Sequence, residues 1–174
     1  AMELNVVLII FNRAGLTAWV ARAIARAGPT RVFIIGDGPR KDRANDSEKV
    51  TAARDAAESV DWRCDVRINY AETNMGCTGR IPSGLDWVFS QVDKAIILED
   101  DCLPHPTFFP YCVELLDRYR NDTRIGQISG DNYAEPRQRP YSYLFSEYVS
   151  TWGWATWRRA WNQYDAKMTM WPEI

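Results

Sequence analysis

The chain has 174 residues, and its 46% hydrophobic and 25% charged residues give the balance of a globular domain rather than of a disordered chain. The 21 basic and 23 acidic side chains leave a formal net charge of −2, so the chain lacks the basic footprint of nucleic-acid or anionic-membrane binding. Four cysteines without CxxC spacing and one histidine favour reduced thiols over a zinc site, and no apolar run approaches the ~20 residues of a transmembrane helix.

Strand-like and helix-like segments alternate through the first part of the chain. In chain order, the predicted elements are a strand at Leu4–Ile10, a helix at Ala14–Ala27, a strand at Arg31–Ile35, a loop and helix within Lys41–Ser59, a strand at Cys64–Tyr70, a turn at Asn74–Gly79, a helix at Ser83–Val92 and a strand at Lys94–Leu98. The first strand is almost continuously apolar, as a strand buried on both faces should be. This alternation predicts an α/β fold with a mainly parallel sheet flanked by helices.

The second part of the chain carries more varied patterns. The predicted elements there are a helix at Phe108–Tyr119, candidate strands at Ile125–Ser129, Tyr143–Phe145 and Tyr148–Val149, and a helix at Ala155–Trp161. Trp154, Trp157 and Trp161 recur at helical spacing, which favours core packing over ligand contact for these side chains. Because no repeat, low-complexity tract or linker interrupts the chain, we expect one domain over residues 1–174, located in the cytoplasm.

Three consecutive carboxylates, Glu99-Asp100-Asp101, directly follow the predicted strand at 94–98. Like charges this close repel and raise each other's pKa, and a divalent cation relieves that repulsion. Hard oxygen ligands suit Mg²⁺ or Mn²⁺, which can in turn bind a diphosphate and stabilise charge on a leaving phosphate oxygen. The alternative is that the acids favour the start of the helix near Pro106 through its dipole. Their position at a strand end favours the metal site.

Other polar residues also follow predicted strands, and ligands of open α/β sheets bind outside the carboxyl ends of the strands. Asn12-Arg13 follow the first strand, and for Arg13 a diphosphate or base contact is favoured over a surface position at a helix start. Asp37 lies in the turn after the second strand and fits either a ligand contact or a local hydrogen bond. Arg80, near the start of the helix at 83–92, fits either a diphosphate contact or a salt bridge.

The block IILEDDCLPHPTFFPYCVELL resembles the metal-binding segment of inverting glycosyltransferases of the GT-A fold, a group that includes N-acetylglucosaminyltransferase I and bacterial hemolysin-like or family 2 glycosyltransferases. In that segment a hydrophobic strand ends in three acids, and a turn with proline leads to a helix that opens with paired phenylalanines, here Phe108-Phe109. The resemblance extends in order along most of the chain, through VVLIIFNR, FIIGDGPR, ISGDNY and TWGWATWRRAW.

The resemblance implies a Rossmann-like GT-A domain that takes a nucleotide-diphosphate sugar, a UDP-sugar, as donor and inverts the anomeric centre in one in-line displacement. Asp101 would coordinate Mn²⁺ or Mg²⁺, and its two acidic neighbours would hydrogen-bond the ribose or the transferred sugar. Together with the residues inferred above, the expected donor-binding set is Asn12, Arg13, Asp37, Arg80, Glu99 and Asp100.

On the acceptor side, Trp152-Gly153 are the candidates, because aromatic faces match apolar sugar faces and glycine permits a close approach. The resemblance implies a glycan or lipid-linked acceptor of a bacterial surface-polysaccharide pathway. The catalytic base of these enzymes lies downstream of their Gly-Trp element, and we expect the chain to end in or just before that segment. Asp131 and Asp165 are the candidates for the base within the chain.

Two other functions stay open at this point. A module that kept the donor pocket but lacked the base would bind a nucleotide sugar without transferring it. A sugar nucleotidyltransferase would use a similar sheet, but it should carry a glycine-rich loop with arginine and lysine after the first strand. The corresponding segment here, FNRAGLT, contains one glycine.

Overall fold

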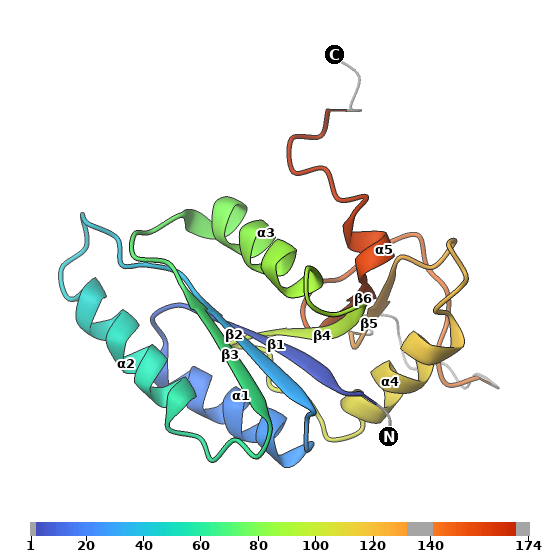
Figure 1. Cartoon of the computed structure of the whole chain (residues 1–174), viewed down its shortest axis with the longest axis horizontal. Helices are drawn as coiled ribbons and strands as arrows, with labels where there is room; N and C mark the ends of the chain where they lie inside the picture. The colour runs from blue at the N-terminus through green and yellow to red at the C-terminus, as the bar shows by residue number, and fades with distance from the viewer. Residues whose placement is uncertain (1–2, 132–140, 170–174) are drawn as a thin grey trace.

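The computed structural model describes residues 3–131 and 141–169, and six strands form its central sheet in the order β3-β2-β1-β4-β6-β5 (Figure 1). The strands are β1 (Asn5–Ile10), β2 (Arg31–Gly36), β3 (Asp65–Tyr70), β4 (Lys94–Glu99), β5 (Gln127–Ser129) and β6 (Trp154–Trp157). The first four are parallel to one another, whereas β6 runs antiparallel between β4 and β5. The predicted α/β fold with a mainly parallel sheet is confirmed.

Helices cover both faces of this sheet (Figure 1). They are α1 (Ala14–Arg26), α2 (Asp46–Glu58), α3 (Gly76–Phe89), α4 (Phe108–Arg118) and the short α5 (Arg158–Trp161). Apolar side chains of α1 and α4 pack with Val6, Leu8 and Ile10 of β1, and those of α3 pack with Val7 and Ile9 on the other face. Both faces of β1 are therefore buried, which explains its continuous apolar sequence. Across the described ranges, no helix has the length and apolar character that a membrane crossing needs.

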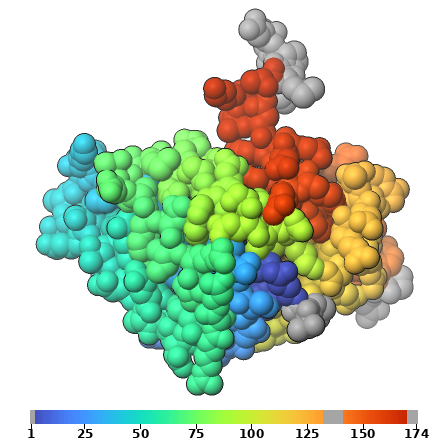
Figure 2. All heavy atoms as spheres, viewed as in Figure 1, coloured from blue at the N-terminus to red at the C-terminus, as the bar shows by residue number. Residues whose placement is uncertain are grey.

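The stretch 154–157 corrects one prediction. A helix was expected over Ala155–Trp161, but residues Trp154–Trp157 form β6, and only Arg158–Trp161 are helical. The strand is hydrogen-bonded on both sides, to β4 and to β5, and Ala155 and Trp157 are buried. Pairing with two strands outweighs a local tryptophan spacing that also matches a helix. Figure 2 shows the segment around α5 lying against α3, where the rings of Trp161 and Phe89 stack.

Helix α3 begins seven residues earlier than the predicted start at Ser83, so the turn expected at Asn74–Gly79 is largely helical. The sequence contains no strong helix-start signal there, because Gly76 and Gly79 favour a turn. The signal lies in another part of the chain, since the carboxylate of Asp37 accepts the backbone N–H groups of Met75 and Gly76, each at 2.9 Å. Those groups are the unpaired donors of a helix start.

The strands expected at Tyr143–Phe145 and Tyr148–Val149 are not formed. This segment packs through aromatic rings, with Tyr143 and Phe145 making edge contacts with Tyr119 just after α4. The hydroxyl groups of Tyr119 and Tyr143 lie 2.7 Å apart and share a hydrogen bond. Aromatic and β-branched residues therefore produced a strand-like pattern in a segment whose contacts are made by side chains rather than by a backbone ladder.

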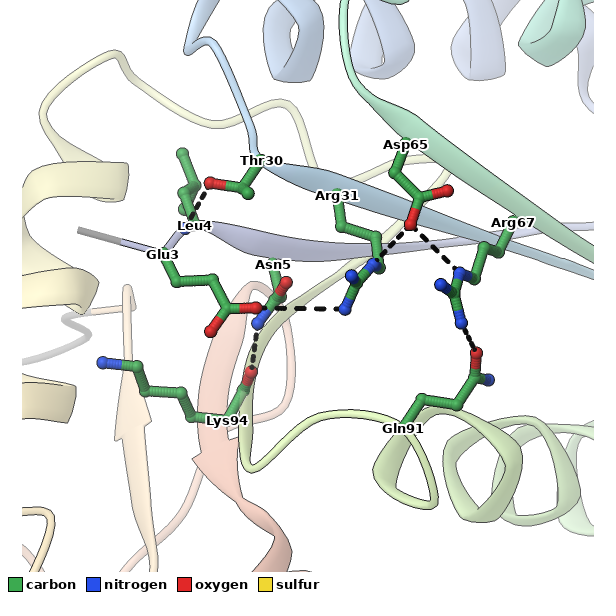
Figure 3. Close-up of polar contacts among 9 residues, drawn as sticks. All are labelled: Glu3, Leu4, Asn5, Thr30, Arg31, Asp65, Arg67, Gln91 and Lys94. Atoms are coloured by element: carbon green, nitrogen blue, oxygen red, sulfur yellow. Dashed lines mark hydrogen bonds and ion pairs between the residues drawn. The ribbon is translucent and has the colours of Figure 1, made fainter. Parts of the chain in front are cut away.

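A network of charged side chains lies at the amino ends of β2 and β3 (Figure 3). Asp65 accepts hydrogen bonds from Nε of Arg31 at 2.7 Å and from Nε of Arg67 at 3.1 Å, and Arg67 also bonds to Gln91. The hydrogen bond from Arg31 is the main reason that the pKa of Asp65 lies below its ordinary value. Because each charge in this network has a partner, this edge of the sheet is stabilised internally.

Candidate functional site

The strand register brings the predicted site residues to the opposite edge of the sheet. Ile9 of β1 is the partner of Glu99 in β4, and Ile10 is the partner of Gly36 in β2. The residues that follow these three parallel strands therefore lie at neighbouring positions along the carboxyl edge. They are Asn12-Arg13 after β1, Asp37 after β2 and Glu99 to Asp101 at the end of β4. Ligands of this kind of sheet bind at this edge.

Arg13 connects the first strand end to the acidic run. Its Nη1 donates to Oδ2 of Asp101 at 2.8 Å, and its Nη2 makes a hydrogen bond and ion pair with Oδ1 of Asp100. The buried carboxylate of Asp100 also accepts the backbone N–H of Phe11 at 3.4 Å. Sequence reasoning predicted all three charged residues as site residues, but it did not predict that they pair with each other.

One guanidinium does not balance three carboxylates. Glu99 lies half-buried beside the pair, and its carboxylate has no hydrogen bond or ion pair with the rest of the described chain. Burial, followed by the charges of Asp101 and Asp100, raises the pKa of Glu99 above its ordinary value. Burial also raises the pKa of Asp100, although Arg13 opposes that shift. The edge therefore retains a negative potential that an additional cation would relieve.

The ligand atoms available at this edge decide which cation fits. Carboxylate oxygens suit Mg²⁺ or Mn²⁺, whereas the soft sulfur of the neighbouring Cys102, whose thiol pKa burial raises to about 12, is a poor ligand for these ions. Within residues 3–131 and 141–169, no group of three or more histidine, cysteine or acidic side chains could hold a metal ion by itself. Mg²⁺ is commonly bound through one or two carboxylates and substrate phosphates. The carboxylates of the acidic run therefore fit a Mg²⁺ or Mn²⁺ ion that is also bound to a diphosphate.

Asn12 belongs to a second polar cluster at this edge. Its Nδ2 donates to Oδ1 of Asp46 at 2.8 Å, and Arg40 binds the same carboxylate through Nη2 at 2.8 Å. The guanidinium of Arg40 also lies 5.0 Å from the centre of the Phe11 ring, a cation–π distance. The hydrogen bonds from Arg40 lower the pKa of Asp46, which is buried at the start of α2. Sequence reasoning did not single out Asp46 or Arg40, although Arg40 ends the quoted block FIIGDGPR, because no local pattern shows that the two pair with each other.

Asp37 makes local hydrogen bonds in the structure, which is one of the two roles left open by the sequence. Its Oδ1 accepts the N–H groups of Gly38 and Met75, and its Oδ2 accepts the N–H of Gly76 and Nδ2 of Asn74, all at 2.8–2.9 Å. A carboxylate has about four acceptor sites, so protein donors fill this one. Asp37 therefore holds the start of α3 against the end of β2. Its contact with a nucleotide stays a prediction that requires one of these bonds to be exchanged.

The guanidinium of Arg80 is also hydrogen-bonded to protein oxygens. This buried group donates from Nε to the carbonyl oxygen of Gly36 at 3.0 Å and from Nη2 to the carbonyl and side-chain oxygens of Asn69 at 2.6 and 2.7 Å. Burial lowers its pKa below the ordinary value. The residue ties α3 to the ends of β2 and β3, and a direct contact with a diphosphate stays a prediction.

A cavity of about 1070 Å³ lies beside the acidic run, between α4, the β5–β6 pair and the segment 141–153. We call it the aromatic cavity after six of the residues that line it: Phe108, Tyr111, Tyr119, Tyr143, Phe145 and Trp152. Both acceptor-side candidates, Trp152 and Gly153, line it, and Trp152 is half exposed. Gly153 has a φ of +78°, a backbone conformation that favours glycine.

The two candidates for the base are placed differently. Asp131 lines the aromatic cavity, and its carboxylate accepts a hydrogen bond from the hydroxyl of Ser150. Asp165 lies beyond α5, where its carboxylate accepts the backbone N–H groups of Lys167 and Thr169. Asp165 does not line the cavity. The structure therefore brings Asp131, and not Asp165, to the acceptor-side candidates.

The aromatic cavity adjoins the acidic run. Leu98 and Cys102, which flank the three acids, both line the cavity, and Sγ of Cys102 lies 3.7 Å from Oδ1 of Asp101. The acidic run thus lies next to a cavity with aromatic walls, although Arg13 and the three acids are not among the residues that line it. Such a combination suits a ligand that carries a charged group at one end and sugar or apolar faces at the other.

No protein-family model matches the chain, and no curated protein has significant sequence similarity to it. Solved structures do match. A 4-diphosphocytidyl-2C-methyl-D-erythritol synthase from Anaerococcus prevotii DSM 20548 superimposes with a TM-score of 0.53 at 11% identity, over 91% of this chain and 73% of that one. A second structure of such a synthase gives a TM-score of 0.48 at 12% identity, over 95% and 82% of the two chains. At 11% identity, the first match shows the fold.

Proposed function

We propose that the chain is a metal-dependent glycosyltransferase domain, which transfers a sugar from a nucleotide-diphosphate sugar, a UDP-sugar, to a glycan or other hydroxyl acceptor with inversion. One observation carries the proposal. The acidic run at the end of β4 and Arg13 at the start of α1 meet at the carboxyl edge of the sheet, directly beside the aromatic cavity. The resemblance of the blocks at residues 6–13, 33–40, 96–116, 128–133 and 151–161 to GT-A glycosyltransferases supports the same reaction.

On the donor side, Asp101 is the residue that would hold Mn²⁺ or Mg²⁺, because its carboxylate is partly exposed, whereas that of Asp100 is buried. The ion, when bound with the donor, supplies charge stabilisation for the departing diphosphate. Arg13 and the start of α1 add positive charge suited to phosphate oxygens. Glu99, half-buried next to them, offers acceptor oxygens to a ribose or sugar hydroxyl.

On the acceptor side, the aromatic cavity would hold the acceptor, with Trp152 stacking on a sugar face. Asp131 is then the base. Its carboxylate takes the proton of the acceptor hydroxyl as the acceptor oxygen bonds to the anomeric carbon and the bond from that carbon to the phosphate oxygen breaks. The hydroxyl of Ser150 orients this carboxylate. A single base suffices for this displacement when the reactants are well aligned.

Nucleotidyl transfer is the competing reaction, because the first structural match is by name a synthase of a diphosphocytidyl compound. That reaction uses a nucleoside triphosphate, and the segment after β1 would have to wrap it. Here only residues 11–13 connect β1 to α1, and none of them is glycine. The short connection favours a diphosphate donor held from outside the edge.

Product analysis tests the proposal. We expect slow, Mn²⁺-dependent release of UDP from a UDP-sugar, identified by screening UDP-, GDP- and CDP-sugars with chromatographic detection. Asp131→Asn should lower this turnover at least ten-fold without weakening UDP binding, whereas Asp165→Asn should leave it unchanged. Release of pyrophosphate from a nucleoside triphosphate and a sugar phosphate would support nucleotidyl transfer instead. Donor binding without release from any sugar nucleotide would support a binding module.

A further inference from the structure

Arg13 contacts the same carboxylate that is assigned to the metal. Its guanidinium is shared between two acids, with Nη1 2.8 Å from Oδ2 of Asp101 and Nη2 paired with Asp100. Both contacts cross from the start of α1 to the end of β4. No other arginine or lysine forms an ion pair with either acid in the described part of the chain. The guanidinium is thus the internal counter-cation of the acidic run.

A metal ion on Asp101 would bring a second cation close to Arg13. Its Oδ2 is bonded to Arg13, and its Oδ1 lies 3.7 Å from Sγ of Cys102. A Mg²⁺ ion binds a carboxylate oxygen at ~2.1 Å and keeps near-ideal octahedral geometry. An ion bound to either oxygen of Asp101 would lie within a few ångströms of the guanidinium, and two cations at such a distance repel each other. Metal and guanidinium therefore compete for this carboxylate.

The two arms of Arg13 are not equivalent. The side chain of Asp100 is 3% exposed and is also fixed by the backbone N–H of Phe11, whereas the side chain of Asp101 is 36% exposed. Exposed ion pairs contribute little to stability, while removing the partner of a buried charge is costly. The contact with Asp101 is therefore the one that opens, and the contact with Asp100 keeps Arg13 at the site.

We propose that Arg13 takes the place of the divalent cation at Asp101 in the nucleotide-free protein, and that a metal–diphosphate complex displaces it onto the phosphate oxygens. This inference rests on the proposed function. The exchange replaces one charged hydrogen bond of the guanidinium by another, since phosphate oxygens accept such bonds as carboxylates do. The metal alone offers the displaced guanidinium no new acceptor, so metal and nucleotide bind tightly only together.

Titration of Mn²⁺ into the full chain, followed by loss of the electron paramagnetic resonance signal of the free ion, tests the exchange. Without nucleotide, Arg13→Met should bind Mn²⁺ at least ten-fold more tightly than the wild type. With UDP present, the wild type should bind Mn²⁺ at least ten-fold more tightly than it does without UDP, and Arg13→Met should gain less. Arg22→Met, which changes an exposed arginine of the same helix, should behave as the wild type.

Equal affinity of wild type and Arg13→Met for free Mn²⁺ would overturn the exchange. If Arg13→Met does not fold, Arg13→Gln replaces it in the same titration, and equal affinity of this variant and the wild type for free Mn²⁺ would overturn the exchange. The proposed function fails in a different way. Absence of UDP binding under every condition, while Arg13→Met still gains affinity for Mn²⁺, would contradict the donor site and support the competition at Asp101.

Discussion

Most polar side chains at the carboxyl edge are already bonded to protein groups, and their commitments differ in kind. Asp37 and Arg80 are buried and bonded mainly to the backbone, so they fix the loops around the site. Arg13 and Asp101 are partly exposed and bonded to each other, so a charged ligand can exchange their contacts. This difference separates residues that shape the site from residues available to a ligand.

Replacing Asp37 by alanine should lower the free energy of unfolding by about 3 kcal/mol, because it leaves the N–H groups at the start of α3 without acceptors. Asp37→Asn keeps one acceptor oxygen and should cost about half as much. Asp61→Ala, a matched change at an 82% exposed side chain, should stay within about 0.5 kcal/mol of the wild type. Urea denaturation measures all three, and equal stability of the two alanine variants would contradict the structural role of Asp37.

Acidification should selectively remove the contribution of Asp46. Hydrogen bonds from Arg40 hold its pKa in the folded protein below the ordinary value of 3.8 that applies to the unfolded chain. The stabilisation is therefore fully present above that value and is lost as the pH falls from 3.8 through the pKa of the folded state. The stability difference between wild type and Asp46→Asn should be largest near neutral pH and should shrink in acid. A constant difference between about pH 7 and pH 3 would contradict this account.

The residue types of the site could be predicted from the sequence, but their contacts could not. Glu99 to Asp101 and Asn12-Arg13 stand out because each set follows an apolar strand. The pairing of Arg13 with Asp101 joins residues 88 positions apart and depends on side-chain conformations that no local pattern encodes. Asp37 also follows an apolar strand, which made it a candidate ligand contact. Its actual contacts could not be predicted, because its four hydrogen-bond donors come partly from residues 74–76, beyond the next strand.

At the scale of elements, sheet pairing and helix packing decide what local patterns leave open. The position of β6 between β4 and β5 follows from hydrogen bonds on both of its edges. Tryptophans three or four residues apart suit a helix, so the local pattern misidentified this strand. Long apolar strands such as β1 and β4 were predicted correctly, because burial on both faces allows few other sequences.

The contact between α3 and β2 gives a sharp test of this packing. A Cβ added at Gly84 would lie 2.7 Å from Cγ2 and 2.8 Å from Cδ1 of the fully buried Ile35, whereas one added at Gly15 of α1 meets nothing within 4 Å. Overpacking costs about 1–3 kcal/mol, and a helical alanine gains up to about 1 kcal/mol over glycine. Gly84→Ala should therefore destabilise the protein by about 1–2 kcal/mol.

Gly15→Ala is the matched control, and it should keep or raise stability by up to about 1 kcal/mol. Thermal unfolding of both variants measures the difference. Equal melting temperatures for Gly84→Ala and Gly15→Ala would show that α3 does not pack on β2 as described.

At the scale of the whole molecule, the two edges of the sheet have different roles. The amino ends of β2 and β3 are held by matched ion pairs, while the carboxyl edge carries an excess of acidic charge beside the aromatic cavity. The alternation of strands and helices was enough to predict that the acidic run lies at the carboxyl edge, but it did not predict the ion pairs at the amino ends. The cavity was not predictable, because its walls combine α4, β5, β6 and a segment without regular structure.

Calorimetric titration of UDP in the presence of Mn²⁺ tests the central claim, that Asp101 at the end of β4 binds a nucleotide diphosphate through a divalent cation. The wild type should bind UDP only with the metal, Asp101→Asn should lose this binding, and Asp117→Asn, which breaks the pair with Lys94 at the other end of β4, should retain it. Equal metal-dependent affinity in wild type and Asp101→Asn would contradict the account.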